Sequence, residues 1–597
     1  MIRDQITRIL KDAVKNAGFA DADSNITSTA NAQFGDYTTT IAMQLGKKEQ
    51  KNPFSIAEKI AQNIEIKDPI GSVKIIRPGF INFFLSKNSL QNELQTILQN
   101  EGKYGSSNKF KEKKVIVEYS SPNIAKPFTI GHLRSTIIGD AIANLLEFIG
   151  FQVFRDSHIG DWGTQFGKLI YAIKYFNEYS FEDIETSKNP LKELVNLYVI
   201  FHKRAEDKPE LEEEARKIFK KLEDGDKEIR ALWQKCIDLS FQEFNKIYSK
   251  LGVKFTENNG RGFGESFFEN KMKPILEELE KYAWYKDSKG AKIVQFPGDK
   301  LPPFMIIKQD GATLYSTRDL ATDKFRLTNS RYGKDVKIIN EVGAEQSLYF
   351  RQLYETEKML GWVNEGQRVH VKHGLYRFKD TKMSTRKGNT IWLEEVLEES
   401  RKRAYSLSRD DSKGRSEENS KKNRFDHLLA NHEAEDVAEA VGIGALKWND
   451  LKRSSHLDVV FDWDEILNMQ GNSGPYMQYT YVRCLSVLSR HPLDEILPPT
   501  LHRGQNDIPL NTDELAIMRM LAKFPEVLMS SAQQYAPHYV CTYLYELGQK
   551  YNLFYQKHPI LKAENNMKDF RLALTAATAN VIKTGLNLLG IDVVNKM

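Results

Sequence analysis

A glycine and a histidine at the start of a predicted helix are the first residues whose types and spacing could do chemistry. They stand in the string Thr129-Ile130-Gly131-His132, and apolar residues return at helical spacing directly after it. The free backbone N–H groups and the positive dipole end of a helix N-terminus attract phosphate. The glycine would let a flat ligand approach the backbone, and the histidine could donate a hydrogen bond to a phosphoryl oxygen. The string by itself fits a phosphate site or an ordinary helix start, and no G-x-G-x-x-G pattern here indicates a dinucleotide site.

The elements that would position this string are a strand, a turn, a helix and a second strand. Residues 115–119 alternate as a strand buried on at least one face should, and Pro122 ends that strand. From residue 132 to 149 the apolar residues have helical spacing, and Gly150 stands in the usual position after a helix C-terminus. Residues 151–154 begin the next strand. Units of this kind build parallel sheets, so we predict an α/β core.

A basic loop much later in the chain has a second signature. It reads TKMSTRKGN, from Thr381 to Asn389, and an apparent helix follows it. Together with the earlier string, this loop resembles the H-x-G-H and K-M-S-K-S signatures of class I aminoacyl-tRNA synthetases, in the expected order. The match is closer still to the arginyl-tRNA synthetase family, through SSPNIAKPF, IGHLRSTIIGD, GDWGTQFG, MSTRKGN and GNSGPYMQYTYVR. The resemblance covers essentially the whole chain, and coincidence does not explain several motifs in a fixed order.

The resemblance implies an α/β Rossmann-type parallel-sheet catalytic core with an N-terminal α+β domain and a C-terminal all-α helical-bundle domain. A chain of 597 residues is long enough for about three or four domains. In order, we expect an N-terminal domain at 1–108 that contacts the tRNA D-loop and elbow, a catalytic domain at 109–400 with an insertion at about 175–300, a charged connecting segment at 401–433, and a helical anticodon-binding domain at 434–597.

Two segments within this order carry narrower expectations. The pattern at 292–296 indicates that the second nucleotide-binding half of the catalytic domain resumes there. Residues 398–424 are so highly charged that we expect a surface excursion that does not pack.

The resemblance also implies the activity of an arginine–tRNA ligase. Such an enzyme joins L-arginine to ATP as arginyl-adenylate and then moves the arginyl group to the 3′ end of tRNA(Arg). The first step is an in-line displacement at the α-phosphorus, which depends mainly on positioning and charge stabilisation. The implied catalytic residues are His132, Lys126, Lys382 and Arg386. The implied ATP-binding residues are Thr129, Gly131, His132, Lys382, Met383, Ser384 and Lys387.

Two positions depart from the family signatures. Thr129 stands where the first histidine of H-x-G-H is expected, and the second lysine of K-M-S-K-S is missing. In arginine-specific enzymes with this loop, a lysine upstream of the first motif compensates, and Lys126 occupies that place. Thr129 is the true departure, because a threonine is shorter than a histidine and keeps one hydroxyl donor.

Recognition of arginine requires carboxylates that can meet a planar guanidinium. The implied arginine-binding residues are Glu118, Ser121, Asn123, Tyr315, Asp319 and Gln346. The two carboxylates would meet the guanidinium, the tyrosine would close the pocket over the side-chain stem, and the two amides would bind the α-amino and carboxylate groups.

Three alternatives remain open at this stage. Arg318 and Asp323, close to Asp319, could mark an ordinary exposed helix start. A glutamine- or glutamate-specific relative would place a basic or neutral pocket where the two carboxylates stand. A catalytically silent tRNA-binding paralogue would lose the phosphate-binding cations and the acidic pocket, and both are retained here.

The composition permits the implied partners, which are tRNA(Arg), L-arginine, and ATP with Mg²⁺, without selecting them. The net charge of +5 comes from 85 basic and 80 acidic residues, so a basic face for RNA could lie within a balanced total. The cysteines form no C-x-x-C pair, which fits a reducing compartment and offers no zinc site; they are Cys236, Cys484 and Cys541. No apolar run reaches membrane-spanning length, and the acids Asp4 and Asp12 in the first amphipathic helix are unlike a transit peptide. We expect a cytoplasmic protein with no membrane partner, and a monomer.

Aromatic residues at two places could contact RNA, although aromatic residues at such spacing more often form core, which is the interpretation we favour. The C-terminal set is Tyr476, Tyr479 and Tyr481, and the N-terminal set is Phe34, Tyr37, Phe80 and Phe83.

Overall fold

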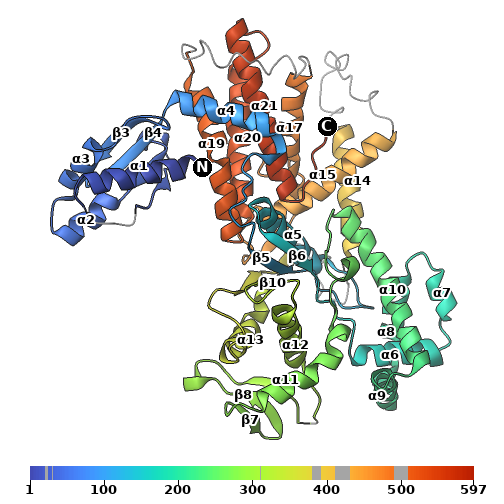
Figure 1. Cartoon of the computed structure of the whole chain (residues 1–597). Coiled ribbons are helices and arrows are strands. Elements are labelled where there is room, and N and C mark those ends of the chain that lie inside the picture. The colour runs from blue at the N-terminus through green and yellow to red at the C-terminus, as the bar shows by residue number, and fades with distance from the viewer. Residues whose placement is uncertain (20–23, 30, 310, 379–390, 411–430, 490–508) are drawn as a thin grey trace.

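A four-stranded parallel sheet in the order β11-β10-β5-β6 lies at the centre of the molecule (Figure 1). The computed structural model describes residues 1–597 except 20–23, 30, 310, 379–390, 411–430 and 490–508. The strands of the sheet are β5 (Lys114–Glu118), β6 (Gln152–Asp156), β10 (Lys337–Gly343) and β11 (Arg368–His373). Each neighbouring pair runs parallel, which confirms the predicted α/β core.

The predicted strand–turn–helix–strand unit is confirmed. Helix α5 (Ile130–Phe148) joins β5 to β6, with Thr129 as its N-cap, and it begins slightly earlier than the apolar spacing indicated. Gly150 follows the helix with φ 103°, a left-handed conformation that favours glycine.

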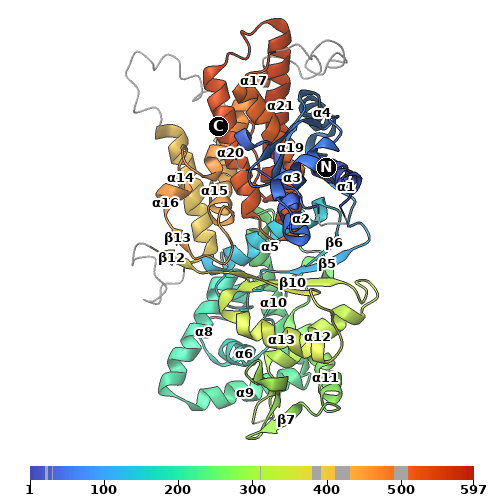
Figure 2. The ribbon, with the colours of Figure 1, turned by 90° about the vertical axis from the view of Figure 1, so that its left-hand side faces the viewer.

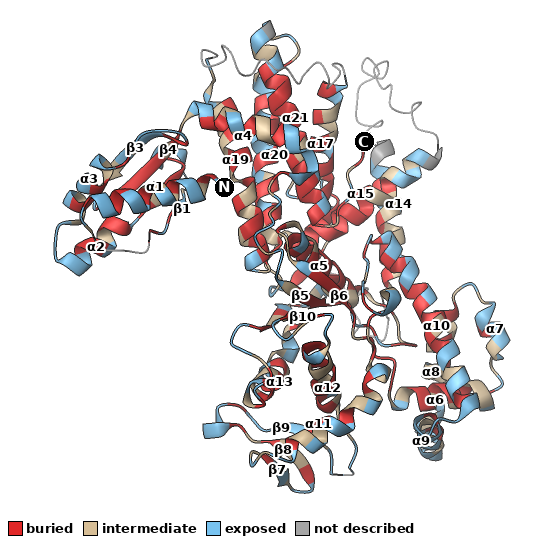
Figure 3. Ribbon diagram, in the orientation of Figure 1, coloured by how far each residue is buried: buried red, intermediate tan, exposed pale blue. Residues whose placement is uncertain are grey.

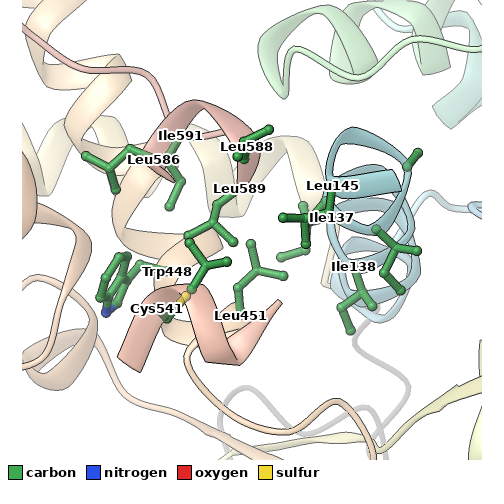
Figure 4. Close-up of a cluster of buried hydrophobic side chains, with 14 of the residues drawn as sticks. Ile137, Ile138, Leu145, Trp448, Leu451, Cys541, Leu586, Leu588, Leu589 and Ile591 are labelled. Carbon is green, nitrogen blue, oxygen red and sulfur yellow. The ribbon is translucent and has the colours of Figure 1, made fainter. Parts of the chain in front are cut away.

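Both faces of the sheet are covered, so most residues of its strands are buried or half-buried. Val115 and Val117 face the larger core, which includes α5, and Ile116 faces a second core with α12 (Tyr315–Thr328) and α13 (Ser347–Met359). Figure 3 shows buried residues concentrated in the sheet and in the helices beside it. In Figure 4, side chains of α5 lie against side chains of the C-terminal part of the chain, among them Leu451 and Leu589.

The insertion between β6 and β10 contains a small sheet as well as the expected helices. Its helices are α6 (Thr164–Tyr175), α7 (Phe181–Glu185), α8 (Pro190–Asp207), α9 (Glu210–Glu223), α10 (Lys227–Lys250) and α11 (Met272–Leu279). Its strands are β7 (Tyr285–Ser288), β8 (Ala291–Val294) and β9 (Phe304–Ile307), and they pair antiparallel. Residues 292–296, where the second nucleotide-binding half was expected to resume, include part of β8 in this small sheet, and β10 is the strand that rejoins the parallel sheet.

The N-terminal α+β unit is an antiparallel sheet with helices packed on it. It comprises α1 (Ile2–Asn16), β1 (Thr27–Ser28), β2 (Tyr37–Thr39), α2 (Ile41–Glu49), α3 (Pro53–Gln62), β3 (Ile70–Ile76) and β4 (Phe80–Leu85). Tyr37 and Phe83 are fully buried and Phe80 is half-buried, whereas Phe34 is 50% exposed and does not belong to the core. Helix α4 (Lys87–Asn100) leaves this unit and packs on α19 (Thr512–Gln533) and α21 (Asn565–Leu588).

The C-terminal part of the chain is helical, as predicted. It contains α14 (Leu393–Asp410), α15 (Asn431–Leu451), α16 (Trp463–Ile466), α17 (Gly474–Leu488), α19, α20 (His538–Lys557) and α21. A short parallel pair, β12 (Tyr376–Phe378) with β13 (Val459–Phe461), was not expected. Figure 2 shows the helical bundle above the central sheet and the insertion below it.

The charged segment at 398–424 does pack over its first part, contrary to expectation. Residues up to 410 belong to α14, which lies along α15. Ser400 of α14 is fully buried and donates to the carbonyl oxygen of Gly442 at 2.8 Å. Because glycine has no side chain, the two helices approach closely at this point. The charged residues lie on the remaining faces of an amphipathic helix, and residues 411–430 are outside the described part.

This close approach predicts a stability defect for Gly442→Ala. The new Cβ would lie 2.9 Å from backbone and side-chain atoms of Ser400, so the helices must separate. Overpacking of this kind costs roughly 1–3 kcal/mol, and we expect a lower thermal unfolding midpoint. Gly102→Ala is the control, because nothing lies within 4 Å of the Cβ that it would add. Equal midpoints for the two variants would contradict the close contact.

Candidate active site

Three segments leave the carboxyl ends of neighbouring parallel strands at one edge of the sheet. They are residues 119–129 after β5, residues 157–163 after β6, and residues 344–346 after β10. Ligands of open α/β sheets bind at this edge. The predicted arginine-binding residues lie on or beside these segments, apart from the two on α12.

The segment after β5 follows a strained backbone path. Ser120 and Ala125 have φ angles of 53° and 54°, and this left-handed region costs a non-glycine residue roughly 1–2 kcal/mol. The backbone N–H of Ser120 donates to Ser135 Oγ at 2.9 Å, and Ser157 Oγ donates to the Ser120 carbonyl at 2.6 Å. These bonds hold in place the loop that carries four predicted site residues.

Asn123 and Gly160 bring the loops after β5 and β6 together. The two residues form a parallel bridge, and the Ile124 N–H donates to the Gly160 carbonyl at 3.0 Å. A Cβ on Gly160 would lie 2.1 Å from Asn123 Oδ1, so only a glycine lets this amide lie across the loop. Asn123 and its neighbour Ser121 are exposed, and Lys126 on the same loop is half-buried.

His132 is held by the backbone of its own helix cap. Its Nδ1 accepts a hydrogen bond from the Thr129 N–H at 3.0 Å, and Thr129 Oγ1 lies 3.1 Å from the same nitrogen. Burial lowers the pKa of His132, so the ring is neutral near pH 7. Because Nδ1 accepts, the proton of the neutral ring is on Nε2, which can then donate. Gly131 beside it is exposed, and the space next to its Cα would admit a Cβ.

The chain that leaves the basic loop is bound to the start of α5. Thr129 and Trp392 form an antiparallel bridge, the Ile130 N–H donates to the Ile391 carbonyl at 3.2 Å, and the Leu393 N–H donates to the Phe128 carbonyl at 2.9 Å. Residues 391–393, which follow the basic loop, therefore lie beside the start of α5, where His132 stands. The predicted loop residues themselves lie outside the described residues; they are Lys382, Met383, Ser384, Arg386 and Lys387.

A buried ion network lies beneath this edge of the sheet. Arg326 of α12 is 1% exposed and is paired with Glu118 at 2.5 Å and with Asp156 at 2.7 Å. Asp323 is bound by Arg368 at 2.7 Å. Burial alone would raise the pKa of Glu118, but the charge of Arg326 outweighs it and the pKa is lowered. Glu118 is thus ionised, and its charge already has a protein partner.

Asp319 presents a carboxylate that is less fully paired. It accepts a hydrogen bond from the hydroxyl of Tyr349, and His158 Nε2 lies 3.4 Å from its Oδ1. Its side chain is 22% exposed. Arg318, in contrast, pairs with glutamates of the insertion. The alternative of an exposed helix start at Asp319 therefore does not hold.

The predicted pocket tyrosine, Tyr315, lies beside Tyr349, whose hydroxyl donates to Asp319. The ring of Tyr315 is 4.9 Å from that of Tyr349, and Tyr315 is 55% exposed. Gln346 is exposed at the end of β10, one turn before Tyr349 on α13. Sequence reasoning missed His158 and Tyr349. The place of His158 directly after β6, at the ligand-binding edge of the sheet, was the signal that could have found it.

Comparisons with known proteins agree with this arrangement. The family description "tRNA synthetases class I (R), catalytic domain" matches residues 93–463, the "Arginyl tRNA synthetase N terminal domain" matches 2–85, and the "DALR anticodon binding domain" matches 477–597. The arginine–tRNA ligase of Clostridium perfringens is 40% identical over 95% of this chain and 94% of its own. The chain belongs to the arginine–tRNA ligases.

Other arginine–tRNA ligases give the same result. That of Fusobacterium nucleatum is 38% identical over 96% of this chain and 95% of its own. The crystal structure of the Plasmodium falciparum arginyl-tRNA synthetase has a TM-score of 0.79 at 25% identity and covers 100% of this chain and 99% of its own. The Thermus thermophilus arginyl-tRNA synthetase has the same fold, with a TM-score of 0.79 at 21% identity and 100% coverage of both chains.

Two further findings concern this arginine–tRNA ligase as far as the structure describes it. Among the described helices, none combines the length and the apolar character that crossing a membrane requires. Among the described residues, no three or more His, Cys, Asp or Glu side chains form a group that could hold a metal ion.

The geometry at the start of α5 predicts different effects for its two polar residues. If His132 makes the predicted hydrogen bond to a charged phosphate, His132→Ala removes a donor worth about 1.5–3 kcal/mol, and adenylate formation should slow by roughly ten- to a hundredfold. Thr129→Ala keeps the backbone N–H that orients the ring and should lose much less. Single-turnover adenylate formation with tRNA present measures both. Full activity of His132→Ala would show that this imidazole does not contact phosphate.

Proposed function

We propose that the arginine side chain lies against α12 and α13, with its guanidinium on Asp319, and that ATP lies at the start of α5. The observation that carries this proposal is the Asp319 carboxylate, held by Tyr349 at the ligand-binding edge of the sheet. Glu118 faces the same space, but its charge is paired with Arg326. Asp319 therefore carries most of the guanidinium binding, and Tyr315 covers the stem of the side chain.

The polar residues on the strand ends would take the other groups of the amino acid. Asn123 and Gln346 are exposed amides at the ends of β5 and β10, and Ser121 lies beside Asn123. They bind the α-amino and carboxylate groups in this proposal. This leaves the substrate carboxylate toward the start of α5, where it must attack the α-phosphorus.

Charge stabilisation would come from both sides of the phosphates. His132 donates from Nε2, and Lys126 supplies a cation from the loop before α5. Lys382, Arg386 and Lys387 of the basic loop neutralise the departing pyrophosphate, and Met383 and Ser384 belong to the same ATP-binding loop. Mg²⁺ enters as part of the ATP substrate. The hydrogen bonds between residues 391–393 and 128–130 support this arrangement, because they hold the segment that directly follows the loop at the helix start.

The direct experiment is ATP–pyrophosphate exchange with each of the twenty amino acids, with and without tRNA. Among the twenty amino acids, we expect exchange only with L-arginine. We also expect this exchange to require tRNA(Arg). Exchange with glutamine or glutamate would favour the neighbouring specificity. No exchange with any amino acid in the presence of tRNA would favour a silent tRNA-binding paralogue.

The pocket predicts that Asp319→Ala will lose arginine and keep ATP. Removal of one partner from a largely buried charge pair costs about 3–5 kcal/mol, so the KM for arginine should rise steeply. Tyr349→Phe should have a smaller effect of the same kind. Glu277→Ala is the control, because Glu277 is an exposed acid on α11, away from the carboxyl edge of the sheet. A KM within about threefold of the parent, near 0.7 kcal/mol, would remove Asp319 from the pocket.

We also propose that α17 and α20 contact bases of the tRNA. Arg483 lies between two exposed tyrosine rings, 4.9 Å from Tyr479 and 5.1 Å from Tyr555. These rings are 38% and 42% exposed, whereas Tyr481 is 5% exposed and belongs to the core. A guanidinium between aromatic faces is a platform on which unpaired bases stack. The position of this platform within the matched anticodon-binding region supports the proposal.

Tyr479→Ala and Tyr555→Ala should each weaken tRNA(Arg) binding. Base–aromatic stacking is worth about 1–3 kcal/mol per base, and the loss should appear in the Kd measured by fluorescence titration. Tyr175→Ala is the control, because this tyrosine is 55% exposed on the insertion. Unchanged affinity for tRNA(Arg) in both variants would show that this face does not contact the tRNA.

The last part of the proposal concerns the RNA contact of the N-terminal unit and the location and oligomeric state of the protein. We propose that the N-terminal domain, residues 1–108, contacts the tRNA D-loop and elbow, and that the protein is a cytoplasmic monomer. The hydroxyl of Tyr37 donates to Glu526 of α19, and Asp36 is paired with Arg519 of the same helix. These contacts hold the unit beside the bundle that would bind the anticodon.

A further inference from the structure

His158 lies between the carboxylates of the proposed arginine pocket. Its Nδ1 donates to the carbonyl oxygen of Phe263 at 3.1 Å, and its Nε2 lies 3.4 Å from Asp319 Oδ1. Its side chain is 13% exposed, and its Nε2 is inaccessible to solvent. Both ring nitrogens therefore face oxygen acceptors, an arrangement that suits an imidazolium, which has two N–H donors.

The charges around His158 come from four elements. Asp319 and Arg326 face it from α12, Glu118 from β5, Glu265 from the short helix at 265–271, and Asp161 from its own loop. Three of these carboxylates have other partners: Glu118 pairs with Arg326, Glu265 with Arg318, and Asp161 accepts from Ser266 N–H and Oγ at 2.7 Å. Asp319 is the acid to which the His158 cation is directly paired.

We propose that His158 is the counter-ion of Asp319 before arginine binds, and that the guanidinium of arginine replaces it, so that binding releases the Nε2 proton to solvent. This inference rests on the proposed role of Asp319. A guanidinium keeps its charge at every pH that a protein tolerates, whereas an imidazolium can lose its own. Two cations on one carboxylate repel each other, so the histidine is the group that gives up its charge. The N–Hδ1 stays on the Phe263 carbonyl, and the bared Nε2 becomes an acceptor that faces the incoming N–H groups.

Electrostatics supports the charged starting state. Burial disfavours the imidazolium, but the hydrogen bond and charge of Asp319 together with the charge of Glu118 raise the pKa of His158 to about 9. The ring is therefore protonated near pH 7 without arginine. A raised pKa that arginine lowers gives arginine an affinity that increases with pH and levels off near pH 9.

The test is titration calorimetry of L-arginine into the protein with unacylated tRNA(Arg) and without ATP, at pH 7.5, in buffers of different ionisation enthalpy. The slope of the observed enthalpy against the buffer enthalpy counts protons, and we expect about one released per arginine. The KM for arginine in pyrophosphate exchange should fall by about tenfold per pH unit between pH 6.5 and 8. A slope of zero in the parent protein with a flat KM profile would overturn the proposal without any variant.

Variants separate this proposal from the pocket itself. His158→Gln keeps a side chain that can donate and accept, and it should bind arginine with no proton release and a flat pH profile. Exposed His456 provides the matched control, His456→Gln, which should release protons like the parent. Proton release that persists in His158→Gln would assign it to another group. Asp319→Ala tests the pocket itself. If this variant binds arginine normally, the proposed function fails. If the variant loses arginine binding but the parent protein releases no proton, only the proposed role of His158 is refuted.

Discussion

The buried pairing of Arg326 with Glu118 and Asp156 is the interaction on which the rest of the site depends. The carboxyl ends of β5 and β6 each present an acid to the interior, and a single guanidinium from α12 is paired with both. Loss of one partner from such a pair typically costs about 3–5 kcal/mol, because a charge is left buried without compensation. The network therefore fixes α12 against the two strands. The first turns of α12 carry Tyr315 and Asp319, so the same network fixes the proposed arginine pocket.

A second buried pair joins the catalytic core to the helical bundle. Arg134 of α5 is paired with Asp450 of α15 at 3.1 Å and also donates to the carbonyls of Leu457 and Ser455. Tyr376 of β12 donates to the same aspartate at 2.6 Å. The helix that begins at His132, the bundle and the strand that leads into the basic loop thus share one carboxylate. The described residues on both sides of that loop are held by contacts with α5 or its partners, close to the proposed phosphate site.

The two pairs illustrate how charge is used differently within one site. Arg326 and Arg134 are paired with fixed carboxylates and hold elements together. Asp319 is paired with a histidine, the one common side chain whose charge changes near neutral pH. A carboxylate with a removable counter-ion suits a substrate that arrives as a cation. A carboxylate with a permanent counter-ion, such as Glu118 with Arg326, suits a structural role.

Much of this protein was determined by the sequence alone. The spacing of apolar residues predicted β5, α5 and β6, because periodicity is a local property of the chain. The order of short motifs indicated the family, the reaction and the positions of most candidate site residues. Tertiary structure alone decided which partners those residues have. Glu118 is neutralised by Arg326, and Asp319 is held by Tyr349 and His158, from elements that are distant in sequence. The packing of α4 on the bundle and the contact of Ser400 with Gly442 also join residues that are distant in sequence, so no local pattern predicted them. Burial and ion pairing depend on what the fold brings next to a side chain, and no local pattern records that.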